Sequence, residues 1–345
     1  EQGGVDYPYA FVRWTEQRNI ESVLQLMDDG RVDVSSLITA RIPIDDAARA
    51  YQLVTKDRSQ LGIVLRYPKP TSATREQQLS TPVGVHTSGV GRAVVGFIGA
   101  GNFARQVLIP AFCGTDARLE CVASRGGISA AHVARKFGIK TSTTDYQTIL
   151  DNDAINTVVI TTRPGQNASM VVDALRAQKN VFVEKPLAVN ESQLNSVREA
   201  YQSVADSGRL LMVGFNRRFA PLTETADRLL EQRTGPLCMI MHVNAGHIPA
   251  DHWVHDPDVG GMRMIGEGCH WLDLLTFLAK SPIEEVRALQ VGRESGSPTL
   301  NDQMTVSMTF GDGSIGTLHY FANGHKSYPK ETLTVYSQGR ILELD

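Results

Sequence analysis

The stretch AVVGFIGAGNFARQVLIPAF, residues 93–112, decides the fold of this chain. Its residues predict a buried strand, then a turn that carries Gly99, Gly101 and Ala104, then a helix. Gly99 permits the tight turn that leaves the strand, Gly101 lets the main chain approach a pyrophosphate, and Ala104 lets the helix pack on the strand. The helix N-terminus then faces the phosphate charge. The pattern favours a nucleotide-binding unit over a glycine-rich turn in an ordinary doubly wound domain.

Bulk composition sets the broad class of protein. The chain has 345 residues, a length that usually holds two domains, and an apolar content of 42% supplies large cores. A net charge of −3 gives no electrostatic footprint for nucleic acid or an anionic membrane, and no apolar run reaches a membrane-spanning length. The four cysteines are scattered, which argues against a disulfide framework and favours a reducing cytoplasm.

The sequence pattern divides the chain into an ordered series of parts. Residues 1–67 predict a small αβ piece, and residues 68–92, rich in Pro, Gly, Ser and Thr, predict an exposed linker. From 93 to 215, strands alternate with helices as in the doubly wound parallel sheet of a Rossmann domain. From 216 to 345, a helix leads into alternating strands, which predicts a second α/β domain with a large open, mostly antiparallel sheet.

Further motifs occur in order along the second part of the chain: EKP at 184–186, GFNRRF at 214–219, GG at 260–261 and GEGCHWLD at 266–273. With the glycine turn, this set resembles the Gfo/Idh/MocA oxidoreductases over residues 93–345. The resemblance implies an NAD(P)-dependent dehydrogenase that transfers a hydride to or from a hydroxyl-bearing carbon of a sugar or sugar derivative, nucleotide sugars included. It also implies a substrate domain whose sheet often mediates assembly, so we expect a homo-oligomer, a dimer or tetramer.

The first part of the chain resembles a different family. Residues 5–67 are similar to the carboxyl end of a zinc-type medium-chain alcohol dehydrogenase. Bacterial bi-domain oxidoreductases join these two modules, so the resemblance implies a truncated fusion whose remnant lacks zinc ligands and is catalytically inert. A native N-terminal extension is the alternative. The closing residues 339–345 indicate a strand cut short, so we expect the substrate domain to be truncated as well.

The resemblance assigns catalysis to Lys185 and His270. The matching lysine of the family lies by the nicotinamide and polarises the reacting oxygen; a surface turn is the alternative for Lys185. His270 is expected to carry the proton because histidine titrates near neutrality; a packed core histidine is its alternative. The family commonly has aspartate at the position of Gly266, and we expect Glu267 to take over that role. Glu267 and Asp273 lie three residues from His270 on the same helix face, so either carboxylate can set its tautomer.

The cofactor is expected to be NAD or NADP, with NADP favoured. The second strand of the Rossmann domain ends at Ser124 and Arg125, where no acidic residue is present to bind the ribose hydroxyl of NAD. Arg125 instead suits a 2′-phosphate, and a solvated loop arginine is the alternative. The remaining cofactor contacts are expected from Asn102, Phe103, Thr161, Thr162, Glu184 and Lys185, in addition to the glycine turn.

Substrate contacts are expected from two segments. Residues 247–255 hold His247, Trp253 and His255, an aromatic face with polar groups that suits a sugar ring; a solvated loop is the alternative. The histidine spacing there does not favour zinc, so no metal is expected. Asn216 and Arg217 follow a strand end and are expected either to reach the substrate or to pack their own turn.

One departure from the family and two functional alternatives remain. A histidine is common where Asn167 stands, and we expect Asn167 to cap the following helix. An enzyme that retains its NAD for epimerisation or elimination is one alternative to a dehydrogenase. A non-catalytic sensor that binds the dinucleotide is the other, and the presence of Lys185 and His270 argues against it.

Overall fold

The computed structural model describes residues 14–57, 59–67, 79–80, 92–291 and 302–345. The chain divides into two compact units, Glu1–Thr74 and Arg75–Asp345. Within the described residues, no helix is both long and apolar enough to cross a membrane.

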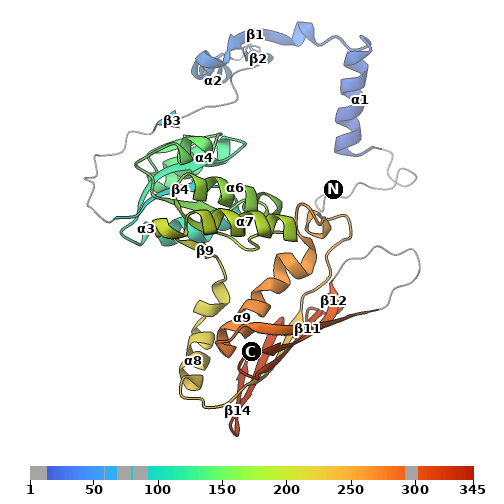
Figure 1. Ribbon diagram of the computed structural model, residues 1–345. Coiled ribbons are helices and arrows are strands. Elements are labelled where there is room, and N and C mark those ends of the chain that lie inside the picture. Colours follow the sequence, from blue (N-terminus) through green and yellow to red (C-terminus); the bar gives the residue numbers. More distant parts are fainter. Residues whose placement is uncertain (1–13, 58, 68–78, 81–91, 292–301) are drawn as a thin grey trace. The chain divides into compact units, whose positions relative to one another are not determined.

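Within its described residues, the smaller unit contains both helices and strands. They are α1 (Glu16–Asp28), β1 (Ile38–Pro43), α2 (Ala47–Lys56) and β2 (Gly62–Arg66). β1 and β2 pair in parallel, and α2 forms the crossover between them (Figure 1). The Thr15 hydroxyl accepts a hydrogen bond from the Arg18 amide and caps α1.

A seven-stranded sheet forms the first domain of the larger unit. Its strand order is β3-β6-β5-β4-β7-β8-β9, with every pair parallel except β3 and β6. Six strands in the order β6-β5-β4-β7-β8-β9 make the arrangement typical of dinucleotide-binding domains, where ligands bind at the carboxyl ends near the β4–β7 switch point. The strands are β4 (Val94–Ile98), β5 (Arg118–Ala123), β6 (Thr141–Thr143), β7 (Thr157–Ile160), β8 (Asn180–Val183) and β9 (Leu211–Val213).

The edge strand β3 (Leu79–Ser80) lies within the interval that the sequence predicts to be a linker. It pairs antiparallel with β6, Leu79 opposite Ser142. The neighbouring residues 68–78 and 81–91 of that interval lie outside the described residues.

Helices cover both faces of the Rossmann sheet (Figure 1). Successive side chains of β4 point to opposite faces. Phe97 enters the core beneath α3 and α4, whereas Ile98 enters the core beneath α6 and α7. The helices are α3 (Ile109–Cys113), α4 (Ile128–Phe137), α5 (Gln147–Leu150), α6 (Pro164–Arg176) and α7 (Glu191–Ser203). This alternation confirms the predicted doubly wound α/β fold.

A six-stranded mixed sheet forms the second domain, in the order β11-β12-β13-β10-β14-β15. All neighbours are antiparallel except β10 and β13, so the predicted mostly antiparallel sheet is confirmed. Trp271 and Leu275 of α9 pack into one core with Tyr320 and Val335 of the sheet. The elements are α8 (Pro221–Leu230), β10 (Cys238–Asn244), α9 (Cys269–Ala279), β11 (Ile283–Gln290), β12 (Gln303–Phe310), β13 (Ile315–Phe321), β14 (Glu331–Ser337) and β15 (Arg340–Leu344).

Candidate active site

The turn after β4 depends on Gly99 for its geometry. Gly99 has a φ of +110°, and a Cβ there would lie 2.7 Å from the main-chain oxygen of Thr161. The Gly99 amide donates to Ala123 O at 2.9 Å, and the Thr161 hydroxyl donates to Gly99 O at 3.1 Å. Because φ is positive and Thr161 crowds the Cβ position, only glycine fits this turn. Thr161, expected to contact the cofactor, therefore also supports the turn.

Gly101 differs from Gly99 because the fold leaves its surroundings open. A Cβ at Gly101 would meet nothing within 4 Å. The next residues, Asn102 and Phe103, are exposed and begin a continuous helix, whereas Ala104 is completely buried beneath it. The open space beside the Gly101 main chain at this helix N-terminus therefore fits a dinucleotide diphosphate.

Lys185 follows β8 and connects the two domains of the larger unit. Its Nζ donates to the Gly266 carbonyl at 2.8 Å, and its peptide bond to Pro186 is cis. Gly266 belongs to the π-helical turn Met264–Gly268, which leads directly into α9. The ammonium is therefore held between the carboxyl edge of the Rossmann sheet and the start of α9. Burial raises the pKa of the adjacent Glu184, although the charge of Lys185 opposes the shift.

His270 lies in the first turn of α9, close to the same ammonium. Its side chain is 7% exposed, and its Nδ1 is buried without a hydrogen-bond partner among the described residues. The ring packs edge-on against Phe215 and Trp271. Burial, followed by the charges of Lys185 and Arg217, lowers the pKa of His270 to about 3. The imidazole is therefore neutral near pH 7, the form that accepts a proton, and the expectation that this histidine titrates near neutrality is wrong because burial and two cations disfavour its charged form.

The two carboxylates near His270 in the sequence have other partners. Glu267 accepts a hydrogen bond from Tyr320 Oη at 2.6 Å and pairs with Arg263 Nη2 at 2.8 Å. Burial opposes ionisation, yet these bonds hold the pKa of Glu267 below its ordinary value. Asp273 accepts two hydrogen bonds from Arg218. Glu267 is thus directed to the sheet by Arg263 and Tyr320.

Close packing explains why glycine occupies position 266. A Cβ at Gly266 would lie 2.8 Å from the Gly260 carbonyl oxygen. Gly260 approaches closely in turn, since its own Cβ would lie 2.7 Å from Val254 Cα and O. An aspartate at 266 therefore does not fit this main-chain arrangement, and a carbonyl oxygen occupies the place beside Lys185.

The turn after β9 holds its arginine in an ion pair. Asn216 and Arg217 lie in the 3₁₀ turn Asn216–Phe219. The Arg217 guanidinium forms two hydrogen bonds with Glu331 and lies 5.3 Å from the Trp271 ring. Asn216 Oδ1 accepts a further hydrogen bond from Arg217 at 3.2 Å. These contacts favour packing of the turn, the second of the two roles expected from the sequence.

The segment 247–255 lies against the Rossmann domain. The Trp253 side chain is 39% exposed. The Arg163 guanidinium lies over its ring, 5.2 Å from the ring centre. His247 is exposed, whereas His255 is buried, with Nε2 3.3 Å from Ile248 O. No group of three or more possible metal ligands is found within the described residues.

At the end of β5, Ser124 and Arg125 have different environments. The Ser124 hydroxyl lies 2.7 Å from that of Ser129, and its amide donates to Thr143 O at 3.0 Å. Arg125 is exposed. Its side chain therefore lies where a ligand at the carboxyl ends of β4 and β5 can reach it.

Asn167 has a different role from the predicted helix cap, and that prediction is wrong. The helix α6 begins at Pro164 with Arg163 as its N-cap, so Asn167 lies inside the first turn. Its side chain is completely buried, and Nδ2 donates to Glu184 O at 3.0 Å and to Pro186 O at 2.9 Å. One signal in the sequence could have revealed this role: Asn167 is a polar residue on the apolar, inward face of α6. A helix cap would not need to lie on that face.

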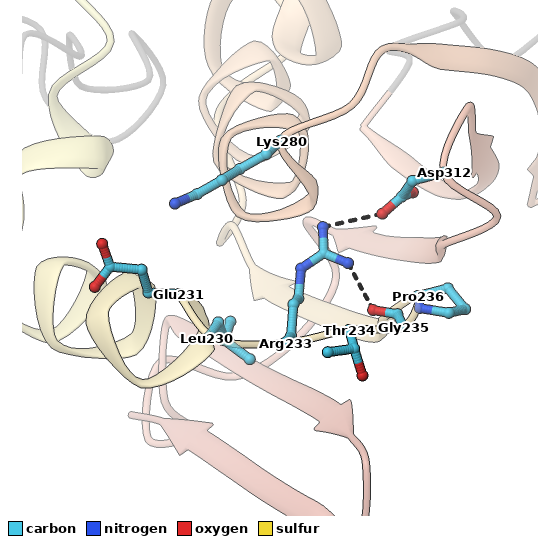
Figure 2. A pocket seen from close by; sticks show the side chains of 8 residues that line it. All are labelled: Leu230, Glu231, Arg233, Thr234, Gly235, Pro236, Lys280 and Asp312. Atoms are coloured by element: carbon cyan, nitrogen blue, oxygen red, sulfur yellow. Dashed lines mark hydrogen bonds and ion pairs between the residues drawn. The ribbon is translucent and has the colours of Figure 1, made fainter.

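A pocket of ≈390 Å³ elsewhere in the second domain is drawn in Figure 2, and none of the candidate site residues described above lines it. It lies where α8 and α9 end, and Arg233 there pairs with Asp312 at 2.9 Å and donates to Gly235 O at 2.7 Å. Lys280 pairs with Asp227 at 2.9 Å. Because both cations already have protein partners, we assign this pocket no ligand. The lining residues are Leu230, Glu231, Arg233, Thr234, Gly235, Pro236, Lys280 and Asp312.

Comparison with known protein families supports the same division of the larger unit. Residues 93–215 match the model described as "Oxidoreductase family, NAD-binding Rossmann fold", and residues 224–342 match the "GFO/IDH/MocA C-terminal domain". The chain carries both domains of the Gfo/Idh/MocA oxidoreductase family. These two matches include the glycine turn, Lys185 and His270.

Two relatives of this Gfo/Idh/MocA chain are dehydrogenases by name. D-xylose 1-dehydrogenase (NADP(+)) 2 of Haloferax volcanii is 29% identical over 54% of this chain and 57% of the relative. Levoglucosan dehydrogenase of Pseudarthrobacter phenanthrenivorans is 24% identical over 67% of this chain and 66% of the relative. The chain therefore spans less than two thirds of the length of either relative.

A solved structure has the same fold. Myo-inositol dehydrogenase from Lactobacillus casei, determined in complex with NAD(H) and myo-inositol, superposes with a TM-score of 0.62 at 19% identity. The match covers 74% of each chain. At this identity the likeness establishes the fold of the two domains.

Alanine substitution should separate the roles of the two glycines. Gly101→Ala should leave the melting temperature within about 1 °C of wild type because the new methyl group meets no protein atom. It should weaken dinucleotide binding by about tenfold or more, since the methyl group occupies the space that the diphosphate needs. Calorimetric titration with NADH and NADPH measures the affinity.

Gly99→Ala is the matched control. It should destabilise the fold by about 1–3 kcal/mol because a Cβ at this φ overlaps the Thr161 main chain. Unchanged dinucleotide affinity in Gly101→Ala would contradict a diphosphate site at this turn.

Stability should fall in mild acid because of His270. Its folded pKa of about 3 lies below its ordinary value of 6.5, so protons bind the unfolded chain more tightly. The stability from keeping it neutral is full above pH 6.5 and is lost as pH falls toward 3. From about pH 7.5 to about pH 5, wild type should lose about 2 kcal/mol more than His270→Gln in urea unfolding. The control is His132→Gln, at an exposed site on α4, which should behave as wild type.

Proposed function

We propose that this chain is an NAD(P)-dependent dehydrogenase or reductase that acts on a CH–OH group of a sugar or sugar derivative, nucleotide sugars included. The observation that carries the proposal is the pairing of a held ammonium, Lys185, with a neutral buried imidazole, His270, at the carboxyl edge of a dinucleotide-binding sheet. The relatives named for D-xylose, levoglucosan and inositol support the substrate class.

The residues of the glycine turn fit the diphosphate of a dinucleotide. The open space at Gly101 and the exposed Asn102 and Phe103 provide main-chain donors at a helix N-terminus. Thr162 and Glu184, at the ends of β7 and β8, lie along the same edge of the sheet. A bound nicotinamide supplies the acceptor or donor for the hydride.

The protein itself accepts or returns one proton and stabilises the charge that develops on the substrate oxygen. In the direction of oxidation, the substrate hydroxyl gives its proton to the neutral imidazole of His270. The Lys185 ammonium stabilises the negative charge that develops on the substrate oxygen. Its neutral partner, the Gly266 carbonyl, leaves the positive charge uncancelled. Glu267 contributes indirectly by anchoring the turn before His270 to Arg263 and Tyr320.

Substrate binding is assigned to the segment 247–255. The part-exposed side chain of Trp253 is assigned to stack on a sugar ring, and exposed His247 of the same segment supplies a polar group. The turn after β9 is assigned the packing role, because Arg217 pairs with Glu331 and lies over Trp271, whose ring packs against His270. His255 is buried, with Nε2 3.3 Å from Ile248 O, so its proposed role is to hold the shape of the segment 247–255.

We favour NADP as the cofactor. Exposed Arg125 stands at the end of β5, where NAD-binding domains usually have an acidic residue. One relative carries NADP(+) in its name, whereas solved structures of the fold carry NAD(H). The arginine of this chain is the feature that decides our choice.

We assign the parallel β1–α2–β2 unit to a remnant of a zinc-type alcohol dehydrogenase, which takes no part in catalysis.

The outer face of the second sheet is proposed as a surface for assembly. Ile240 and Ile315, about half exposed on the outer face of the second sheet, are suited to contact a second copy of the chain. Free cysteines fit a reducing cytoplasm.

Substitution of Lys185 tests the proposed function. Lys185→Ala should lower turnover by about 10²–10³-fold because the developing oxyanion loses its cation. Dinucleotide affinity should stay within about twofold of wild type, since the diphosphate site lies at the glycine turn. The assay follows absorbance of the reduced cofactor with D-xylose, levoglucosan, myo-inositol and nucleotide sugars. Wild-type turnover by the variant would overturn the proposal, and dinucleotide binding without turnover by the wild type would favour a sensor.

Arg125 should determine cofactor preference. Arg125→Ala should weaken NADPH binding by about tenfold and leave NADH binding unchanged, because the guanidinium can pair only with the 2′-phosphate. Arg135→Ala, at an exposed position of α4, is the matched control and should change neither affinity. Tighter binding of NADH than NADPH by the wild type would contradict the preference for NADP.

A further inference from the structure

We propose that Asn167 is the positioning residue for Lys185: its buried amide clamps the main chain on both sides of the lysine. The inference rests on the proposed role of Lys185 in catalysis. It assigns to a residue of α6 the task of aiming a side chain that follows β8.

The contacts of the amide carry the argument. Asn167 Nδ2 donates to Glu184 O at 3.0 Å and to Pro186 O at 2.9 Å, the carbonyls immediately before and after Lys185. A primary amide has two N–H donors, and both are used here. No part of the Asn167 side chain is exposed, so water does not compete for these bonds.

Thr162 fixes which end of the amide faces the lysine segment. Its hydroxyl lies 2.9 Å from Asn167 Oδ1, which accepts the hydrogen bond. With the oxygen engaged by Thr162, the nitrogen faces Glu184 O and Pro186 O. A residue at the end of β7 therefore orients a residue of α6, which in turn holds the chain leaving β8.

Lys185 is thus held at both ends of its side chain. The clamp fixes the Cα end through the two neighbouring carbonyls, and Gly266 O fixes the ammonium at 2.8 Å. Two anchors leave little freedom for the connecting methylenes. Such preorganisation matters because a displacement of about 1 Å at a catalytic group can cost about 10²-fold in rate.

Asn167→Asp is the sharpest variant because it keeps size and shape while its carboxyl group cannot donate two hydrogen bonds. The readout is the rate at which acetic anhydride acetylates Lys185, measured by peptide mass spectrometry on the full chain. Lys179, a buried lysine bonded to Asn152 O and Ile155 O, reports general unfolding in the same sample. The ratio of Lys185 to Lys179 labelling should rise about tenfold, as expected for the loss of buried hydrogen bonds.

Asn244→Asp is the matched control. Asn244 is also buried, and its amide also donates to two main-chain carbonyls, His325 O at 2.8 Å and Tyr328 O at 3.3 Å. This variant should lower the melting temperature without changing the labelling ratio. Thr162→Val, which removes the orienting hydroxyl, should raise the ratio in the same direction as Asn167→Asp. An unchanged ratio in Asn167→Asp would overturn the proposal, whether or not the variant is less stable.

Kinetics give a second readout that a merely structural role would not move. With a sugar that the wild type turns over, Asn167→Asp should lower kcat by about 10²-fold and leave KM and dinucleotide affinity near wild type. Asn167→His, which retains one donor, should recover part of the loss. If Lys185→Ala retains wild-type turnover, the proposed function fails, while the labelling ratio still decides whether Asn167 positions Lys185.

Discussion

The hydrogen bond from Lys185 Nζ to the Gly266 carbonyl is the contact on which the candidate site depends. It joins the chain after β8 to the π-helical turn that leads into α9. The same turn brings His270 into a buried position where the ammonium helps to lower its pKa. The positions of the proton acceptor, His270, and of the cation, Lys185, therefore both depend on one junction between the domains. The amide of Asn167 secures the first half of that junction, and Glu267 secures the second.

Close main-chain packing at this junction determines which group binds the Lys185 ammonium. Gly266 and Gly260 leave no room for a side chain, so a main-chain oxygen receives the ammonium. A carbonyl does not neutralise charge and does not titrate. In this chain the Lys185 ammonium is therefore held by a neutral oxygen.

Local sequence patterns were sufficient to predict most of the architecture. The glycine turn and the alternation of buried strands with helices predicted the Rossmann sheet, and the period-two pattern after residue 238 predicted the second sheet. The three-residue strand β6 (Thr141–Thr143) was missed because so short a polar segment has no measurable period. Parallel pairing of β10 with β13 was also beyond the pattern, since strand neighbours are selected by tertiary packing.

The site was harder to predict than the fold because its contacts join distant segments. Asn167 contacts carbonyls about twenty residues away, which no local signal reveals. The spacing of Glu267 and His270 suggested a shared face, an inference that assumes ordinary α-helical geometry. Glu267 instead lies within a π-helical turn, where that periodicity does not apply. Its partner Tyr320 lies on β13 and was recognisable only from the folded structure, whereas its other partner, Arg263, stands only four residues before it.

The π-helical turn Met264–Gly268 has a further consequence for protein engineering. Such a turn accommodates one more residue than the same length of ordinary α-helix. Each residue of an α-helix turns the following side chains by about 100°. A loop graft that shortened this turn by one residue would therefore rotate the imidazole away from the ammonium while leaving every motif intact. In transplanting this region, the residue count is as important as the residue types.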